Sequence, residues 1–312
     1  MSINVRKLPG ASFGATVEGL EPAEPPTDEI VAAVRAALAE HVLLVVRGHR
    51  PPTDAELVRF AGGFGPLFDG GELFGITSPT KEILRLTSER NELGVETGPS
   101  AATPLPWHTD YSYLPCAARE TFLEAVQLPA DGGGSTWFAD TYDAWESLAQ
   151  TIHDRLDGLV GIHSIKGSGR HLSRDEKRAA RAGREHKNPG FTYPGGRVPA
   201  RHPLAHRHPD SGRVALYVNS LVAGIEGWDP DDADSLLEDL MVHATDEGRV
   251  YRHAWEVGDL VIFDDVGTIH RRDPSDPDQV RTMRQLSTML ADDGLSTTGP
   301  AGTPAVSETG SA

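Results

Sequence analysis

From about residue 105 onward, the sequence alternates short apolar or β-branched segments with turns rich in glycine and proline. Many short strands separated by turns favour a sandwich or a jelly-roll barrel. The sequence contains neither a GxGxxG motif nor a Walker loop, so no nucleotide-binding βαβ unit is indicated. We therefore expect a mainly β fold with flanking helices. The predicted strands are Glu120–Leu128, Ser135–Phe138, Val214–Val218, Val250–Trp255 and Asp259–Phe263, the last two joined as a hairpin through Val257–Asp259.

The first third of the chain predicts a helix, a buried strand and a second helix. Apolar residues recur at helical spacing over Thr27–His41, and the β-branched run Val42–Val46 follows. Thr53 and Glu56 form a capping box that opens the second helix. Two further helices are expected at Tyr142–Leu148 and Asp231–His243. All four helices are expected to pack outside the strands.

Composition and charge narrow the possible partners. The net charge of −17 argues against nucleic acid, because such binding depends on neutralising phosphates. The longest apolar run, Val42–Val46, is too short to cross a bilayer, and no secretory signal precedes it. The single cysteine, Cys116, suits a reducing compartment, so we expect a cytoplasmic protein. The segment His163–Arg213 differs from the rest of the chain, with 12 Lys/Arg against 4 Asp/Glu.

The segment Pro106–Tyr113 contains the candidate metal ligands His108 and Asp110. Alternate residues of a strand point to the same face, so both side chains could reach one ion. A His-x-Asp pattern alone is weak, and the chain contains a second one at His208–Asp210. That second pattern has the Pro-Asp-Ser-Gly chemistry of a surface turn. We therefore assign the metal pattern to His108 and Asp110.

A site with two histidines and one carboxylate needs another histidine from elsewhere in the chain. The best candidate is His270, 160 residues beyond Asp110 and directly after an apolar strand. A closed barrel would bring such an early and a late strand side by side. Arg281 follows eleven residues after His270, where its guanidinium could clamp a carboxylate.

These motifs together resemble the iron(II)/2-oxoglutarate dioxygenases of the taurine dioxygenase and 2,4-dichlorophenoxyacetate dioxygenase type. The resemblance covers roughly residues 5 to 292. It is carried by the opening "VLLVVRGH…TDAELVRFAGGFGPL", by "WHTD", by the glycine turn before Thr136, by "HPDSGRVALYVN", and by "GDLVIFDDVGTIH" with Arg281 beyond it.

The resemblance implies a double-stranded β-helix, a jelly-roll of the cupin-like kind. It implies Fe(II) held by His108, Asp110 and His270, and 2-oxoglutarate held by Arg281 and Thr136. Together with O₂, these cosubstrates would hydroxylate a C–H bond of a small anionic or zwitterionic molecule and release succinate and CO₂. Halogenating relatives have a small residue in place of Asp110, so a carboxylate there favours hydroxylation. A homo-oligomer is a further implication of the resemblance.

The chain departs from the family where the substrate would bind. Taurine dioxygenase-like members have a second arginine fifteen residues after the distal histidine, and Gln285 stands there in this chain. Arg284 is its neighbour, but strand alternation turns the two side chains to opposite faces. The family's Asp-Asn-Arg before the histidine is replaced by Asp264–Gly267. Taurine itself is therefore a doubtful substrate, and Arg284 and Gln285 remain candidate substrate residues.

We expect one dioxygenase domain over residues 1–293 and a disordered tail over residues 294–312. Residues 164–212 would form an insert resembling the lid of this family. Its basic side chains are either a solvated surface or a cationic cover for an anionic substrate. In the second case, Arg170 and Arg201 are candidate substrate residues.

Three alternatives stay open. The same cofactors could end in desaturation, cyclisation or rearrangement within a biosynthetic pathway. The barrel could instead bind a metal without turnover. The third alternative is a zinc hydrolase, which would need a general base near the metal, and no motif supplies one.

Overall fold

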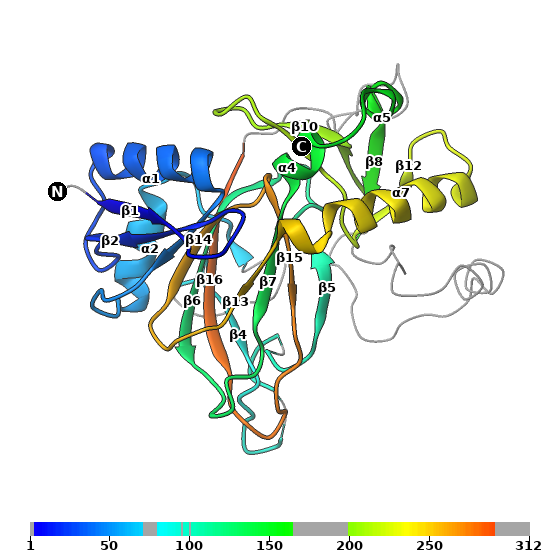
Figure 1. The fold of residues 1–312 in the computed structure, drawn as a ribbon. Coiled ribbons are helices and arrows are strands. Elements are labelled where there is room, and N and C mark those ends of the chain that lie inside the picture. The colour runs from blue at the N-terminus through cyan, green and yellow to red at the C-terminus, as the bar shows by residue number, and fades with distance from the viewer. Residues whose placement is uncertain (1–2, 71–79, 95, 100, 165–198, 291–312) are drawn as a thin grey trace, which may run out of the picture.

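The computed structural model describes residues 3–70, 80–94, 96–99, 101–164 and 199–290. Within these ranges the chain is mainly β, with helices on the outside (Figure 1). Most of the predicted lid, including Arg170, and the whole predicted tail lie outside the described residues. Residues 199–212 are described, and they contribute short strands.

The largest sheet has seven strands, and all neighbours are antiparallel except β2 and β3. Its two longest strands, β6 and β16, lie side by side near one end. In spatial order the strands are β1 (Asn4–Lys7), β2 (Ala15–Glu18), β3 (Leu43–Val46), β14 (Leu260–Asp264), β6 (Ala118–Gln127), β16 (Thr282–Met289) and β4 (Leu84–Thr87).

A second, antiparallel sheet has four strands, and the described strands also form two small sheets. The four strands are β13 (Val250–His253), β7 (Thr136–Asp140), β15 (Thr268–Arg272) and β5 (Leu105–His108), in that order. The small sheets comprise β12 (Val222–Ile225), β8 (Val160–His163) and β9 (Ala200–Pro203), and β10 (Ala205–Arg207) with β11 (Val214–Leu216).

The predicted helices are confirmed within a few residues of their expected ends. The capping box of the second helix is present, with the Thr53 side chain and the Glu56 side chain bonded reciprocally to backbone N–H groups. No helix of the described residues is long and apolar enough to span a bilayer. The helices are α1 (Asp28–His41), α2 (Asp54–Gly62), α4 (Thr141–Glu146), α5 (Gln150–Leu156) and α7 (Pro230–Ala244), with a short 3₁₀ turn at Glu247–Arg249.

Side-chain alternation along the buried strands creates two apolar layers. In β14, Leu260 and Ile262 pack with α1 and α2, whereas Val261 and Phe263 pack on the opposite face against Phe138 of β7. The second apolar layer therefore lies between the seven-stranded and four-stranded sheets. A third apolar cluster joins β7 and β15 to α4, α7 and the small sheets.

The predicted hairpin of β13 and β14 is wrong. β13 pairs with β7 in the four-stranded sheet, whereas β14 pairs with β3 and β6 in the seven-stranded sheet. The turn between them carries the chain from one sheet to the other. The expected closed barrel is also not observed, because the described strands form separate sheets. The expected proximity of early and late strands is nevertheless confirmed, since β5 and β15 are paired neighbours.

Candidate active site

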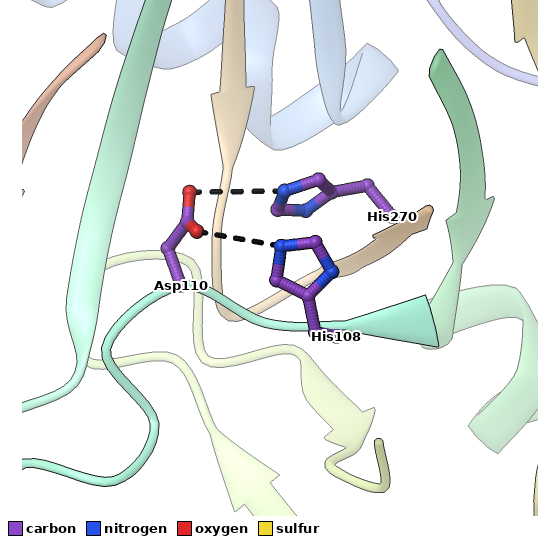
Figure 2. Close-up of side chains that lie close together, drawn as sticks. All are labelled: His108, Asp110 and His270. Carbon is purple, nitrogen blue, oxygen red and sulfur yellow. Dashed lines mark ion pairs between the residues drawn. The ribbon is translucent and has the colours of Figure 1, made fainter. Parts of the chain in front are cut away.

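Three potential metal ligands, His108, Asp110 and His270, meet where β5 lies beside β15 (Figure 2). His108 ends β5 and pairs in register with His270 on β15. Their Nε2 atoms lie 3.7 Å and 3.8 Å from the two carboxylate oxygens of Asp110. Within the described residues, this is the one group of three whose ligand atoms all lie within 4.8 Å of one another.

Both histidines present Nε2 to the common centre. The Nδ1 atom of His108 lies 2.8 Å from the carbonyl oxygen of Pro106, so a proton on Nδ1 leaves the Nε2 lone pair available. The His270 ring packs against Phe138 and Phe263, with ring centroids 5.8 Å and 5.1 Å away. Burial lowers the pKa of His270 well below its ordinary value, and the nearby His108 adds to this effect. A neutral imidazole is the form that binds a metal.

Asp110 is held from its backbone and from its carboxylate. It lies in the turn after β5, where Tyr111 adopts a left-handed φ of 55°, so the expected strand does not extend to this residue. Its backbone N–H donates to Asp265 Oδ1 at 3.2 Å, and Gln285 Nε2 donates to its Oδ2 at 2.8 Å. Burial raises the pKa of the Asp110 carboxyl, while His108 and the Gln285 hydrogen bond oppose that change.

The three residues line a cavity of about 230 Å³, and Thr136, Arg281 and Gln285 line it as well. Arg281 is 1% exposed, and its Nη2 donates to the carbonyl oxygen of Gly134 at 3.1 Å. Its Nε is buried with no hydrogen-bond partner in the described chain. Burial lowers the pKa of Arg281 to about 9, and the neighbouring Arg272 adds to this effect. A buried cation with an unused N–H favours an anionic ligand.

Thr136 lies at the start of β7 and also lines the cavity. Its hydroxyl oxygen accepts a hydrogen bond of 3.0 Å from the indole Nε1 of Trp255. This contact fixes the hydroxyl oxygen as an acceptor toward Trp255 and leaves its proton available to an acceptor in the cavity.

Arg284, a candidate substrate residue, is not among the residues that line the cavity. Its guanidinium lies on the opposite face of β16 from Gln285, where it donates to Glu124 and Asp54. The alternation predicted for this pair is therefore confirmed. Arg201 likewise does not line the cavity and instead pairs with Glu226 at 3.0 Å.

Sequence reasoning missed two residues that shape the site. Asp265 is fully buried and bonds to the Asp110 backbone and to the Thr121 hydroxyl. Burial raises its pKa well above the ordinary range, and nearby Asp110 adds to the effect. Arg272 lines the cavity and donates to the carbonyl oxygen of Thr103. Its position two residues after His270 on one strand was the signal that could have identified it.

The second His-x-Asp pattern forms a turn, as predicted, but its histidine is not at the surface. His208 is 8% exposed, and its Nδ1 accepts from the backbone N–H groups of Asp210 and Ser211. The ring thus stabilises the turn locally.

The donor set fits a divalent first-row metal. Two neutral imidazoles and one carboxylate on one side of an ion leave its other positions open to ligands. In this chain the Nε2 atoms and the carboxylate converge on one point. Gln285 holds the Asp110 carboxylate, and Asp265 holds the Asp110 backbone N–H. The buried Arg281 supplies a cation for the anionic end of a second ligand.

Residues 4–287 match the family model described as taurine catabolism dioxygenase TauD, TfdA family. The pentalenolactone F synthase of Streptomyces avermitilis is 32% identical over 292 residues, which cover 93% of this chain and 95% of that relative. The (S)-phenoxypropionate/alpha-ketoglutarate-dioxygenase of Sphingobium herbicidovorans is 30% identical and is covered over 90% of its length by 88% of this chain.

Solved structures agree with these matches. The crystal structure of AAD-2 in complex with Mn(II) and N-oxalylglycine aligns with a TM-score of 0.73 and 26% identity, covering 93% of this chain and 98% of that one. A taurine dioxygenase from Burkholderia xenovorans aligns with a TM-score of 0.72 and 26% identity, covering 93% of this chain and 90% of that one. The chain belongs to the TauD/TfdA family of iron(II)- and 2-oxoglutarate-dependent dioxygenases.

Proposed function

We propose that the chain hydroxylates a C–H bond of a small anionic organic molecule. His108, Asp110 and His270 hold the iron(II), and Arg281 with Thr136 holds 2-oxoglutarate. The observation that carries this proposal is the shared cavity, in which the three converging ligands face a buried arginine with an unused N–H group. We also propose that the two facing sheets form the double-stranded β-helix, or jelly-roll, of this family.

Iron(II), 2-oxoglutarate and O₂, when bound, supply the oxidation of the substrate C–H bond, with release of succinate and CO₂. The residues of the chain supply binding, orientation and exclusion of water. Pro106 fixes the tautomer of His108, and Phe138 and Phe263 enclose the ring of His270. Gln285 holds one oxygen of Asp110 by its side-chain amide. These contacts keep the ligands in place before the metal arrives.

The guanidinium of Arg281 provides the cationic end of the cavity. Gly134 leaves space beside this side chain, because an added Cβ would lie 2.7 Å from Arg281 Nε. Thr136 lies in the same cavity and can donate its hydroxyl proton to a carboxylate. A carboxylate held by Arg281 and Thr136 would leave the other end of 2-oxoglutarate free to reach the metal ligands in the same cavity.

A second outcome with the same cofactors is desaturation, cyclisation or rearrangement in a biosynthetic pathway. The 32% identity to a protein named pentalenolactone F synthase supports this second outcome. The mass of the product separates the two, because hydroxylation adds an oxygen atom and desaturation removes two hydrogen atoms.

Anaerobic titration of the metal-free protein with Fe(II) and 2-oxoglutarate tests the proposal. Binding of the keto acid to the iron is expected to give a weak visible charge-transfer band. His270→Ala is expected to abolish the band, whereas His41→Ala, at the end of α1 and outside the cavity, should retain it. Wild-type protein that binds iron without developing the band would contradict the roles given to Arg281 and Thr136.

A further inference from the structure

One wall of the cavity is built from hydrocarbon side chains of three neighbouring strands. Met283 of β16 pairs with Leu86 of β4, and Gln285 pairs with Leu84 of β4 and Leu123 of β6. All five side chains line the cavity. A leucine therefore flanks Gln285 on each of the two neighbouring strands. This is the position where taurine dioxygenase-like members have the arginine that grips the substrate anion.

Apolar side chains also form other parts of the cavity surface. Leu105 is 38% exposed, and Leu84, Leu86 and Leu221 are partly exposed. Tyr111 and Tyr113 line the same space. Partly exposed leucines that face a cavity favour a ligand with an apolar surface.

Three polar side chains of the cavity, those of Gln285, Arg272 and Arg281, already have partners or roles. Gln285 Nε2 donates to Asp110, and Arg272 donates to the carbonyl oxygen of Thr103. Arg281 is assigned to the cosubstrate, and the cation of Arg284 lies on the other face of β16. Among the described residues, the wall formed by β4, β6 and β16 thus offers hydrocarbon and one committed amide.

We propose that this wall, formed by Leu84, Leu86, Leu123 and Met283, binds the hydrocarbon body of the anionic substrate. In this arrangement Gln285 is a positioning residue for Asp110, and the anionic group of the substrate lies away from it. The inference rests on the proposed function, and it specifies the substrate class of the same site. It excludes taurine and other short zwitterionic sulfonates, which have almost no hydrocarbon to bury.

The affinity for straight-chain carboxylates tests the wall. The anaerobic protein with Fe(II) and 2-oxoglutarate is titrated calorimetrically with butanoate, hexanoate, octanoate and taurine. Each buried methylene should tighten binding roughly fourfold, so each pair of added carbons should lower Kd roughly fifteenfold. Taurine should not bind at millimolar concentration. Equal Kd values along the series, no measurable binding of octanoate, or taurine binding as tight as octanoate would each overturn the proposal.

Two variants of neighbouring residues separate the wall from the rest of the sheet. Leu84→Ser should weaken octanoate binding roughly tenfold and leave butanoate nearly unchanged. Arg85→Ala is the matched control, because Arg85 lies on the other face of β4 and pairs with Asp54 outside the cavity. An equal loss of octanoate affinity in both variants would contradict a specific wall.

The role of Gln285 has a readout that does not depend on substrate. Gln285→Leu should weaken Fe(II) binding roughly tenfold, as expected when a ligand loses its orienting hydrogen bond. Gln285→Arg should gain measurable taurine binding. Unchanged Fe(II) affinity in a folded Gln285→Leu variant would refute the positioning role. The charge-transfer band measured without any substrate tests the proposed function separately, so the two failures are distinguishable.

Discussion

The substitution Gly134→Ala should damage cosubstrate binding although residue 134 carries no functional group. Gly134 has a left-handed φ of +79°, and a Cβ at this position would lie 2.7 Å from Nε and 2.9 Å from Cδ of Arg281. Ordinary van der Waals contacts begin near 3.4 Å. Arg281 would therefore have to move by roughly 0.5–1 Å, inside a cavity where it is 1% exposed.

The expected loss follows from the bonds that such a displacement disturbs. A hydrogen bond to a charged group contributes about 1.5–3 kcal/mol. Loss of one such bond between Arg281 and the carboxylate of 2-oxoglutarate that it holds should weaken 2-oxoglutarate binding roughly 10- to 150-fold. An alanine with left-handed φ should separately reduce the free energy of unfolding by about 1–2 kcal/mol.

Gly132 in the same turn provides the matched control. Its φ is +70°, and a Cβ at this position has no neighbour within 4 Å. Gly132→Ala should therefore show the backbone effect in urea unfolding while leaving the Kd for 2-oxoglutarate unchanged. The assay is anaerobic titration of the Fe(II) protein with 2-oxoglutarate, followed by the charge-transfer band. Equal Kd values for the two variants would refute the argument that Gly134 makes room for Arg281.

Two further predictions concern buried charges outside the cavity. Arg284→Met should lower the free energy of unfolding by about 3–5 kcal/mol, because it leaves the buried Glu124 carboxylate without its ion-pair partner; urea unfolding measures this, and full stability of the variant would contradict it. Burial alone would raise the pKa of Asp259, but hydrogen bonds from His253 and Arg47 lower it to about 2. This lowered pKa stabilises the fold above the unfolded-state pKa of about 4, and the contribution of roughly 2–3 kcal/mol is lost as the pH falls toward 2. Asp259→Asn should therefore flatten the dependence of stability on pH over that interval, and an unchanged slope in acid titrations would count against the assignment.

Local sequence patterns predicted the elements of this fold better than their pairing. The capping box at Thr53 and the buried run at β3 depend on neighbouring residues only, and both are present. The hairpin of β13 and β14 failed because turn chemistry at Gly258 specifies a change of direction, whereas the partner strands are distant in sequence. Face alternation correctly separated Arg284 from Gln285, but it could not show that Glu124 lies opposite Arg284.

The residues of the candidate site show the same difference between local patterns and long-range contacts. His108, Asp110 and His270 could be predicted because their residue types and order match a family pattern, and the structure brings them together. Asp265 could not be assigned, since its role depends on the Asp110 backbone, which lies 155 residues earlier in the chain. From the sequence alone, Asp265 could be recognised only as a departure from the family pattern.

The turns at the two ends of β14 explain why this departure is compatible with the site. At both turns the chain crosses between the seven-stranded and four-stranded sheets, and the second crossing, through Asp265 and Gly267, leads into β15 and His270. Gly267 has no space for a side chain, because an added Cβ would lie 2.1 Å from the Tyr142 ring. The Tyr142 hydroxyl in turn donates to Asp264 at 2.7 Å. Close packing at this turn therefore fixes the direction in which β15 starts, and it places Asp265 beneath the Asp110 backbone with His270 beside His108.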